Sequence, residues 1–243
     1  MDQDSLILNL QDICFSYAGG GKVLDNLHFQ LRKGQKVGVV GYNGCGKTTF
    51  LHVIIGLRKP DSGLVEIFGK PVVNKQDFAD IRTRIGFLFQ DADDQLFSPT
   101  VLEDVAFGPL NQGKSPEEAK GIAMQVLEDL GVPNLAERVT YQLSGGEKRL
   151  AALATVLAMK PDILLLDEPT TGLDEDTKRR IVKILQDLDL SYILVTHEYD
   201  FLANTTDFSY YMKHGRIEAD DGEAIHSHFH VHPLGKHPHQ HPQ

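Results

Sequence analysis

The chain has 243 residues, 41% of them hydrophobic, so it can bury one large core or one core with an inserted lobe. Acidic residues outnumber basic ones, 34 to 24, and the net charge of −10 argues against a protein whose main task is to grip nucleic acid. The first residues carry no basic segment, and no apolar run approaches the ~20 residues of a membrane helix. We therefore expect neither a signal peptide nor a spanning helix, and any membrane association is expected to come through a partner.

The amino-terminal part alternates apolar and polar residues, as half-buried strands do, and then changes to short apolar runs. Turns at Ala18–Gly21 and Pro60–Gly63 separate these runs. The expected strands are 6–15, 23–31, 36–40, 64–68 and 85–89, with a helix from Lys47 to about Ile55.

Residues 91 to about 160 change to helical spacing. One apolar stripe there contains Ala119, Ile122, Ala123, Val126, Leu127 and Leu130. Strands and helices then alternate again: a strand at 162–166, a helix at about 175–188, a strand at 191–196, and a hairpin formed by 208–212 and 216–218. This order predicts an α/β fold, with an α/β core interrupted by a helical insert.

A glycine-rich segment lies between the third expected strand and the first helix. Residues Gly41–Thr49 read G-Y-N-G-C-G-K-T-T and fit the phosphate-binding pattern G-x-x-x-x-G-K-[ST]. Glycines let backbone N–H groups point at a triphosphate, and the helix adds its positive N-terminal end. Lys47 is predicted to reach the β- and γ-phosphates, and Thr48 to offer its hydroxyl to Mg²⁺. Cys45 lies inside this loop, so a disulfide with Cys14 is not expected and a reducing compartment is the simpler interpretation.

A pair of acids follows a wholly apolar run. Ile163–Leu166 is typical of a buried strand in a parallel sheet, and such sheets bind ligands at the carboxyl ends of their strands. Asp167 is predicted to hold Mg²⁺ through water, and Glu168 to polarise the attacking water. Two acids after a strand are often only the start of a loop. Together with the phosphate loop about 120 residues upstream, they predict an NTPase.

A second glycine pair lies inside the helical insert. Ser144, Gly145 and Gly146 precede the amphipathic run Arg149–Ala158, which predicts a helix N-terminus with exposed amides and therefore another anion site. An ordinary N-cap is the alternative, and this motif alone would favour it. Two phosphate-binding helix ends on separate lobes suggest that one nucleotide is held between two copies of the chain.

These motifs, in this order, resemble the ATP-binding cassette family over about residues 5–220. The corresponding motifs are Walker A at Gly41–Thr48, the Q-loop glutamine Gln90, the signature Leu143–Glu147, Walker B at Ile163–Glu168, the D-loop Thr171–Asp174, the switch histidine His197, and Tyr17 as the aromatic residue against adenine. Glu147 is a departure, since many members carry glutamine there, and it puts an acid near the expected γ-phosphate. The resemblance implies a P-loop NTPase core with a parallel sheet, an antiparallel β subdomain and an inserted helical subdomain. This cassette is expected to span residues 1–225, with the insert at about 91–160.

The resemblance also implies an ATPase in which two cassettes close head to tail on two Mg·ATP. The implied catalytic residues are Glu168 as general base, His197 at the γ-phosphate, Gln90 and Lys47. The implied nucleotide-binding residues are Tyr17, Gly41, Asn43, Gly44, Cys45, Gly46, Lys47, Thr48, Thr49, Ser144, Gly145, Gly146 and Asp174, with the signature residues acting from the opposite copy. Thr48, Gln90 and Asp167 are implied to hold Mg²⁺. Taken alone, Tyr17 could be a core residue and His197 a loop histidine; their offsets from the other motifs favour the site.

Residues 90–109 are more specifically similar to the ATPase subunits of cobalt- and nickel-type energy-coupling-factor importers, as are 143–149 and 156–159. This resemblance implies a subunit that powers the import of nickel or cobalt. Its implied partners are a transmembrane coupling protein, which docks near Gln90 and the insert, a membrane substrate-binding component, and a second cassette; no nucleic acid is implied. The implied location is the cytoplasmic face of the cell membrane, as a peripheral protein.

The carboxyl-terminal residues 226–243 contain seven of the eleven histidines of the chain. Four of them alternate with other residues at His226, His228, His230 and His232. Alternating side chains point the same way on an extended chain, and imidazole suits Ni, Co, Cu and Zn. A purification tag or a passive polar tail is the alternative, but tags are usually unbroken histidine runs. We expect a metal-binding tail that is disordered when unbound.

Three other functions compete with nickel or cobalt import. The chain could power the import of another micronutrient, since the selecting site would lie on another subunit. A soluble cassette ATPase in DNA repair or translation would carry long coiled coils or two cassettes, and neither is seen in the sequence. A metal-buffering protein with a vestigial ATPase core is disfavoured because the catalytic motif residues are intact.

Overall fold

The computed structural model describes residues 5–219. The strands are β1 (Leu6–Ser16), β2 (Lys22–Arg32), β3 (Lys36–Val40), β4 (Ser62–Ile67), β5 (Lys70–Pro71), β6 (Ile85–Leu88), β7 (Ile163–Asp167), β8 (Ser191–Thr196), β9 (Phe208–Lys213) and β10 (Arg216–Ala219). The helices are α1 (Lys47–Ile54), α2 (Lys75–Arg82), α3 (Val101–Asn111), α4 (Pro116–Asp129), α5 (Gly145–Leu157), α6 (Glu175–Asp187) and α7 (Tyr199–Thr205), with short 3-10 turns at Ala92–Asp94, Pro133–Leu135 and Thr140–Gln142. Among residues 5–219, none of the helices combines the length and the hydrophobicity that a membrane-spanning helix requires.

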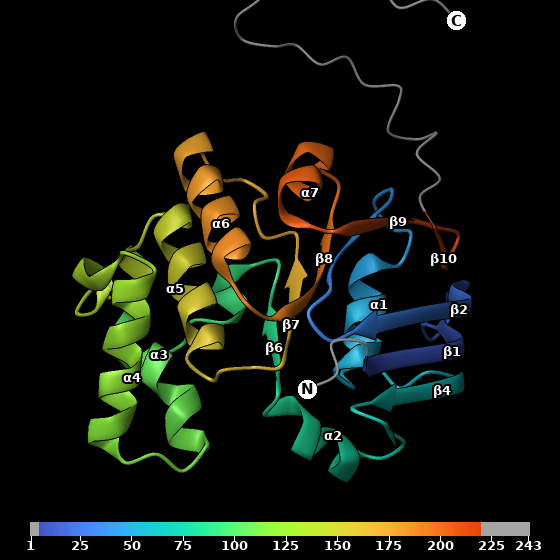
Figure 1. Ribbon diagram of the computed structural model, residues 1–243, viewed down its shortest axis with the longest axis horizontal. Coiled ribbons are helices and arrows are strands. Elements are labelled where there is room, and N and C mark those ends of the chain that lie inside the picture. The colour runs from blue at the N-terminus through green and yellow to red at the C-terminus, as the bar shows by residue number, and fades with distance from the viewer. Residues whose placement is uncertain (1–4, 220–243) are drawn as a thin grey trace, which may run out of the picture.

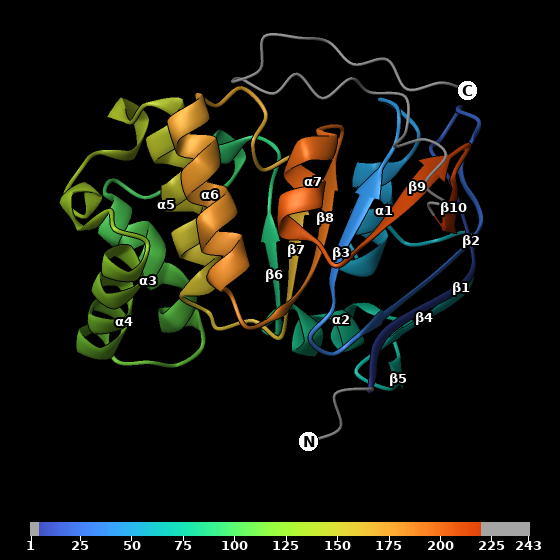
Figure 2. The ribbon, with the colours of Figure 1, turned by 45° about the horizontal axis from the view of Figure 1, so that its top comes forward.

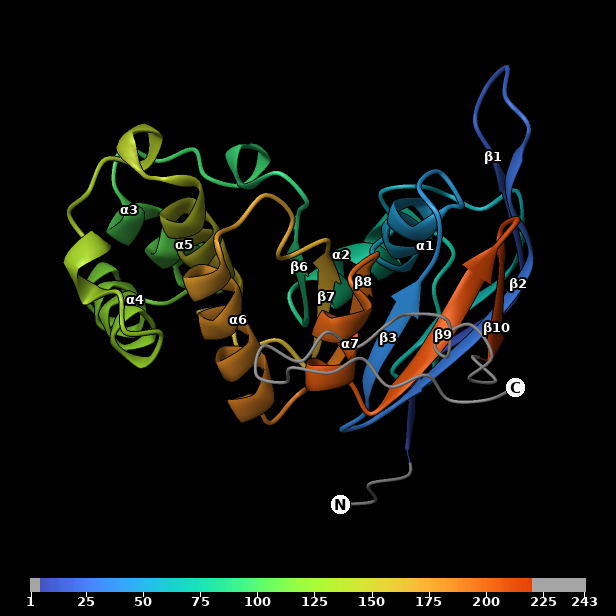
Figure 3. The same ribbon diagram turned by 90° about the horizontal axis from the view of Figure 1, so that it is seen from above.

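The strands form two sheets, seen at the centre and right of Figure 3. One sheet has the order β2-β1-β4-β5 and is antiparallel. The other has the order β10-β9-β3-β8-β7-β6, and it is parallel except for β10 at its edge. The carboxyl ends of β3, β6, β7 and β8 therefore meet along one edge of the parallel sheet, and the phosphate loop, Gln90, Asp167 and His197 lie at or just beyond these ends.

Two apolar cores cover the two faces of the parallel sheet, and β7 contributes to both. Ile163 and Leu165 pack in the core that contains α1, α2 and the antiparallel sheet, whereas Leu164 and Leu166 pack in the core that contains α3 to α7. This division follows from the two-residue period of a strand. A strand buried on both faces must be apolar throughout, which explains the run of residues 163–166.

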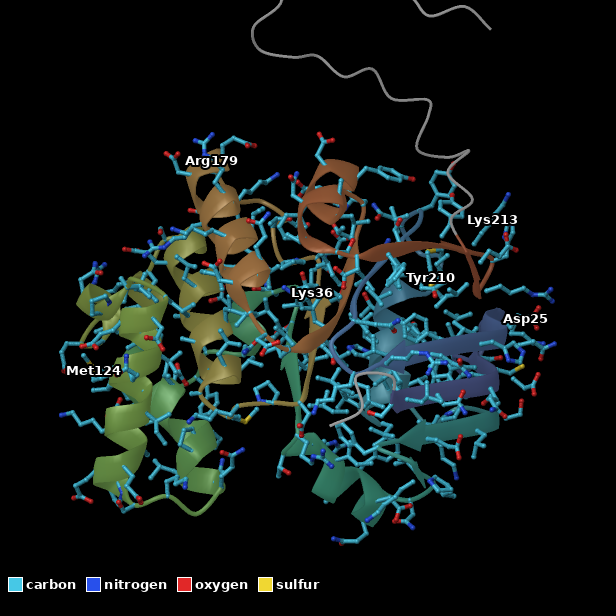
Figure 4. All side chains as sticks on the ribbon, in the orientation of Figure 1. Asp25, Lys36, Met124, Arg179, Tyr210 and Lys213 are labelled. Atoms are coloured by element: carbon cyan, nitrogen blue, oxygen red, sulfur yellow. The ribbon has the colours of Figure 1, made fainter. Side chains whose placement is uncertain are left out.

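The helical insert forms a lobe of α3, α4 and α5, at the left of Figures 1 and 2, whose apolar residues share one core with α6, α7 and a face of the parallel sheet. Figure 4 shows Met124 of this lobe on the opposite side of the molecule from Asp25 and Lys213. Each helix of the lobe begins with a capping box, at Thr100, Ser115 and Ser144. Along α4, the expected stripe is confirmed by Ala119, Ala123, Leu127 and Leu130, which are buried, while Ile122 and Val126 are partly buried.

The structure adds elements that the sequence pattern did not predict. Helix α2 is polar overall, but Asn74 and Asp77 form a capping box that could have indicated its start. The short strand β5 and the seven-residue helix α7 were also missed. The expected carboxyl-terminal hairpin is present, and its first strand also extends the parallel sheet by pairing with β3.

Candidate functional site

The phosphate loop is shaped by glycines at positions that reject a side chain. Gly44 and Gly46 have φ values of 79° and 112°, and Gly46 directly precedes α1 as its N-cap. A Cβ on Gly46 would lie 3.0 Å from the carbonyl oxygen of Val23, and one on Gly41 would lie 2.4 Å from that of Met212. The loop is therefore held closely between β2 and the end of β9.

Lys47 is the first residue of α1, and its side chain is buried. Its ammonium nitrogen donates to the carbonyl oxygens of Gly41, at 2.8 Å, and Tyr42, at 3.3 Å. It also lies 3.8 Å from Oε1 of Glu168. A buried ammonium group that is hydrogen-bonded to carbonyl oxygens of the loop can also donate hydrogen bonds to a polyphosphate held by the same loop.

Glu168 follows β7 and adopts the left-handed conformation, with φ of 46°. A non-glycine residue is held in this region only when its surroundings impose it, and such residues gather at functional sites. The other carboxylate oxygen, Oε2, contacts Nδ1 of His197 at 2.9 Å and accepts a hydrogen bond from Thr171 at 3.3 Å. The structure thus brings together Lys47, Glu168 and His197, which lie far apart in the sequence.

Asp167 is the last residue of β7 and is 2% exposed. Its Oδ1 has no hydrogen-bond partner within residues 5–219. Burial raises the pKa of this carboxyl, and a hydrogen bond from Thr48 and the charge of Lys47 partly offset the rise. A buried carboxylate oxygen without a partner beside a threonine hydroxyl fits a hard cation such as Mg²⁺, which prefers oxygen ligands.

Two adjoining cavities share Thr48 and Gln90. The first has a volume of about 400 Å³ and is lined by Tyr17, Val23, Asn43, Gly44, Gly46, Lys47, Thr48, Thr49, Gln90 and Glu168. The second, of about 650 Å³, reaches from Thr48 and Asp167 to Gly145 and Arg149 on the helical lobe. Most of the residues predicted to bind nucleotide on this chain therefore face one space. Of the expected Mg²⁺ ligands, Thr48 and Gln90 line both cavities, and Asp167 lines the second. Gly41 and Cys45 belong to the loop but do not line the first cavity.

Tyr17 lines the first cavity and is partly exposed. Its hydroxyl is hydrogen-bonded to Thr49 at 3.1 Å, and its ring meets Phe15 edge to face. The Arg58 guanidinium lies 5.2 Å from the ring centroid. An anchored aromatic ring that lines a cavity can stack on a base, and Arg58 competes for that ring; stacking on adenine stays a prediction.

The signature residues lie apart from the first cavity, on the helical lobe. Ser144 is the exposed N-cap of α5, and it forms a capping box with Glu147: the Glu147 carboxylate accepts from the Ser144 amide at 2.8 Å, and the Ser144 hydroxyl accepts from the Glu147 amide at 3.3 Å. The Ser144 amide holds the pKa of Glu147 below its ordinary value. Glu147 therefore closes its own helix terminus, which accounts for an acid at this position. A Cβ on Gly146 would lie 2.7 Å from Oγ1 of Thr177, so this glycine lets α5 approach α6.

Asp174 also caps a helix. Its carboxylate accepts from the Thr177 amide at 2.9 Å and from the Thr177 hydroxyl at 2.8 Å, at the start of α6. It does not line either cavity. Neither Asp174 nor Ser144 therefore faces these two cavities of its own chain.

Among the residues that had no predicted role at the site, Val23 lines the first cavity and Arg149 lines the second, while Thr171 donates a hydrogen bond to Glu168. Thr171 is the first residue of the predicted D-loop and Arg149 begins the amphipathic run after Gly146, and a basic residue at the start of an apolar helical run was a usable signal for Arg149. The predicted metal-binding histidines His226 to His232 lie outside the described residues. Within residues 5–219, no group of three or more histidine, cysteine or acidic side chains is arranged to hold a metal.

Comparisons with known proteins agree with this geometry. The sequence profile of the ABC transporter family matches residues 24–171. A chain of Nitratidesulfovibrio vulgaris with the general description ABC transporter ATP-binding protein is 46% identical over 97% of this chain and 86% of its own length. The energy-coupling factor transporter ATP-binding protein of Methanocaldococcus jannaschii is 40% identical over 87% of this chain and 77% of its own.

Solved structures of ABC transporter cassettes also match this chain. The cbiO1 chain of Clostridium perfringens, part of the ABC transporter complex cbiONQ, matches with a TM-score of 0.80 at 32% identity, over 92% of each chain. A bacterial ABC transporter cassette solved as a dimer matches with a TM-score of 0.80 at 29% identity, over 87% of this chain and 97% of that one. The chain therefore belongs to the ABC transporter family and is one of its ATP-hydrolysing cassettes.

Proposed function

We propose that this chain is the ATP-hydrolysing subunit of an energy-coupling-factor importer for nickel or cobalt. The observation that carries the proposal is an exposed apolar patch beside the Q-loop, formed by Phe97, Phe107 and Leu110. The rings of Phe97 and Phe107 meet edge to face, with centroids 4.8 Å apart, and all three side chains are more than 40% exposed. A contiguous exposed aromatic patch is typical of a protein interface.

Hydrogen bonds of a buried side chain hold the turn that carries part of this patch. Phe97 and Phe107 belong to the 90–109 segment that resembles cobalt- and nickel-type cassettes. The buried carboxylate of Asp104 accepts hydrogen bonds from the amides of Phe97, at 3.2 Å, and Ser98, at 2.9 Å, and so fixes the turn that carries Phe97. A short helix of a transmembrane coupling protein would fit this surface and would hold the cassette at the cytoplasmic face of the membrane, next to a membrane substrate-binding component.

In the proposed reaction, the backbone amides of the phosphate loop and Lys47 bind the phosphates of ATP. Glu168 accepts a proton from the attacking water, and His197 keeps the Glu168 carboxylate oriented through the 2.9 Å contact. The exposed Ser144 and Gly145 of a second copy would close over the γ-phosphate. This arrangement makes hydrolysis depend on dimerisation.

Thr48, Gln90 and Asp167 are the residues that would hold Mg²⁺. The ion would supply positive charge against the charge that develops on the transferred phosphoryl group. The buried Asp167 oxygen without a partner supports this assignment. The cost of burying its charge would be offset when a cation is present.

The choice of nickel or cobalt rests on the 90–109 segment and on the histidine tail, with His226, His228, His230 and His232 as candidate ligands. To test the proposal, the chain is co-expressed with its membrane subunits, and ATP-driven uptake of radioactive Ni²⁺ and Co²⁺ is measured in vesicles. Phe97→Ser should abolish co-purification and uptake but leave the ATPase activity of the isolated chain intact. Val73→Ser is the matched control, because the Val73 side chain is 65% exposed, as Phe97 is at 66%, and it lies between β5 and α2, outside the patch.

Uptake that responds to neither metal, with an intact complex, would favour another micronutrient as the substrate. A chain that binds no membrane subunit would favour a non-transport ATPase.

A further inference from the structure

A third cavity, of about 340 Å³, lies where β1 and β2 meet the carboxyl-terminal hairpin of β9 and β10. Figures 2 and 3 show β10 beside β2, and the two strands are in contact. The lining combines apolar side chains, among them Phe29, Tyr210 and Ile217, with polar ones, among them Asp12 and His28. It shares no residue with the two cavities at the phosphate loop, so ATP binding leaves this cavity without a role.

A β-bulge in β1 brings a carboxylate next to the histidine of this cavity. Strand β1 has two residues, Gln11 and Asp12, where β2 has only His28. A Cβ on Gly63 would lie 2.6 Å from the carbonyl oxygens of Gln11 and Asp12, so this glycine lets β4 lie close to the bulge. Bulges re-aim side chains, and here Oδ1 of Asp12 lies 3.2 Å from Nε2 of His28.

This pair has the geometry of two ligands of one metal ion. Ligand atoms about 2.1 Å from a common ion lie roughly 3.0 to 3.4 Å apart at octahedral or tetrahedral angles. The side chains of His28 and Asp12 are 62% and 74% exposed, so further ligands can reach them. The neighbouring polar side chains are already paired, because Asn9 donates to Glu66 at 2.6 Å and accepts from Gln30 at 3.2 Å.

The pair is an incomplete site by itself. Tight binding of a transition metal takes about four protein ligands, and within residues 5–219 no third histidine, cysteine or acidic side chain joins these two. The sequence supplies histidines on the same chain. Strand β10 ends at the cavity, since Ala219 pairs with Tyr210, which lines it. His226 is only seven residues further along the sequence, a span of up to about 25 Å when extended.

We propose that His28 and Asp12, together with histidines of residues 226–232, form a binding site for a divalent transition metal such as Ni²⁺, and that the carboxyl-terminal segment docks on this cavity when the metal is bound. Imidazole and carboxylate ligands suit such ions. Phe229 and Val231 alternate with the histidines, so they lie on the opposite side of an extended chain and can enter the apolar part of the cavity.

A segment tethered at the cavity wall reaches the pair at a high effective concentration, which favours the chain's own histidines over ligands from another molecule. This inference rests on the proposed metal binding by the histidine tail, but not on transport, because no membrane subunit takes part. The alternative is that the tail binds metal without the cavity.

The test uses Ni²⁺ alone, with calorimetric titration and hydrogen exchange of backbone amides. The full chain is compared with His28→Ala, with Asp12→Asn and with the chain truncated after Ala224. His214→Asn is the matched control. His214 is also an exposed histidine, but it does not line the cavity, and its φ of 49° is one that asparagine tolerates.

We expect the full chain to bind one Ni²⁺ more tightly than any others. His28→Ala and Asp12→Asn should weaken that site at least about tenfold, since the loss of even a supporting partner of a ligand costs about 10- to 100-fold in metal affinity. Truncation should abolish the site, and His214→Asn should leave it unchanged. Ni²⁺ should slow exchange in residues 10–12 and 27–30 of the full chain but not of the truncated one. Both point variants should keep the wild-type ATPase activity.

Wild-type Ni²⁺ affinity in both point variants, with binding lost on truncation, would overturn the shared site and leave metal binding by the tail intact. Equal affinity of the truncated and the full chain would also overturn it, because the cavity pair would then bind without the tail. A full chain that binds no Ni²⁺ would refute both the shared site and the proposed metal binding by the tail.

Discussion

Replacing Glu168 with glutamine should separate ATP binding from ATP hydrolysis. The amide has nearly the same size as the carboxylate and can still contact His197 and Thr171, so the geometry at the end of β7 should persist. It cannot accept a proton from water at neutral pH. Loss of a general base costs about 10²- to 10⁴-fold in rate, so kcat should fall by at least about 100-fold.

The same change should have a small effect on folding. It removes the charge that faces Lys47 at 3.8 Å, but it also removes the cost of burying a carboxylate that is 6% exposed. These contributions oppose each other, and we expect a net change of about 1 kcal/mol or less in the free energy of unfolding. For a chain of this size that corresponds to a shift in Tm of about 4 °C at most. ATP affinity should be retained, because the phosphate loop and Lys47 are unchanged.

The assay combines steady-state phosphate release, ATP binding and gel filtration with ATP, where Glu168→Gln should accumulate a dimer. Glu198→Gln is the control. Glu198 directly follows His197 in the chain, but its carboxylate binds Lys178 at 2.7 Å and Thr170 at 3.1 Å and does not line the first cavity. The control should hydrolyse ATP at a rate within about threefold of the wild type, as expected for a partly exposed pair. Turnover of Glu168→Gln near the wild-type rate would remove Glu168 from the role of base.

Three further predictions follow from the same geometry. Asp167→Asn should abolish hydrolysis and raise the Tm of the nucleotide-free chain at pH 7. Burial raises the pKa of Asp167 in the folded chain above its ordinary value of 3.8, so the charged carboxylate destabilises the folded state at pH values above the folded-state pKa, and asparagine removes that charge. An unchanged or lower Tm in calorimetry would contradict this prediction. Ser144→Arg should preserve ATP binding by the monomer but block ATP-induced dimerisation, and wild-type hydrolysis that is independent of protein concentration would argue against a shared site. Truncation after Ala224 should remove most Ni²⁺ or Co²⁺ binding in titration calorimetry and leave ATPase activity unchanged, with equal metal uptake by both forms as the contrary result.

Local patterns in the sequence were enough to predict the elements that carry the chemistry. The phosphate loop, β3 and β7 were found because short-range rules govern them: glycines where φ is positive, and an apolar run where both faces are buried. The serine–glutamate spacing of Ser144 and Glu147 is also a local rule, the capping box, and it could have explained Glu147 from the sequence alone.

Contacts between distant segments were decided only by the tertiary structure. Glu168 and His197 meet because β7 and β8 are adjacent parallel strands that end at the same edge. Arg149 reaches Phe89, 60 positions earlier in the chain, because α5 packs against β6. No local pattern specifies which helix face meets which loop, since many packings satisfy the same apolar stripe, and that choice depends on how all the side chains fit together. The sequence therefore determined which chemical groups are available, and the packing of the helical lobe on the parallel sheet determined which of them act together.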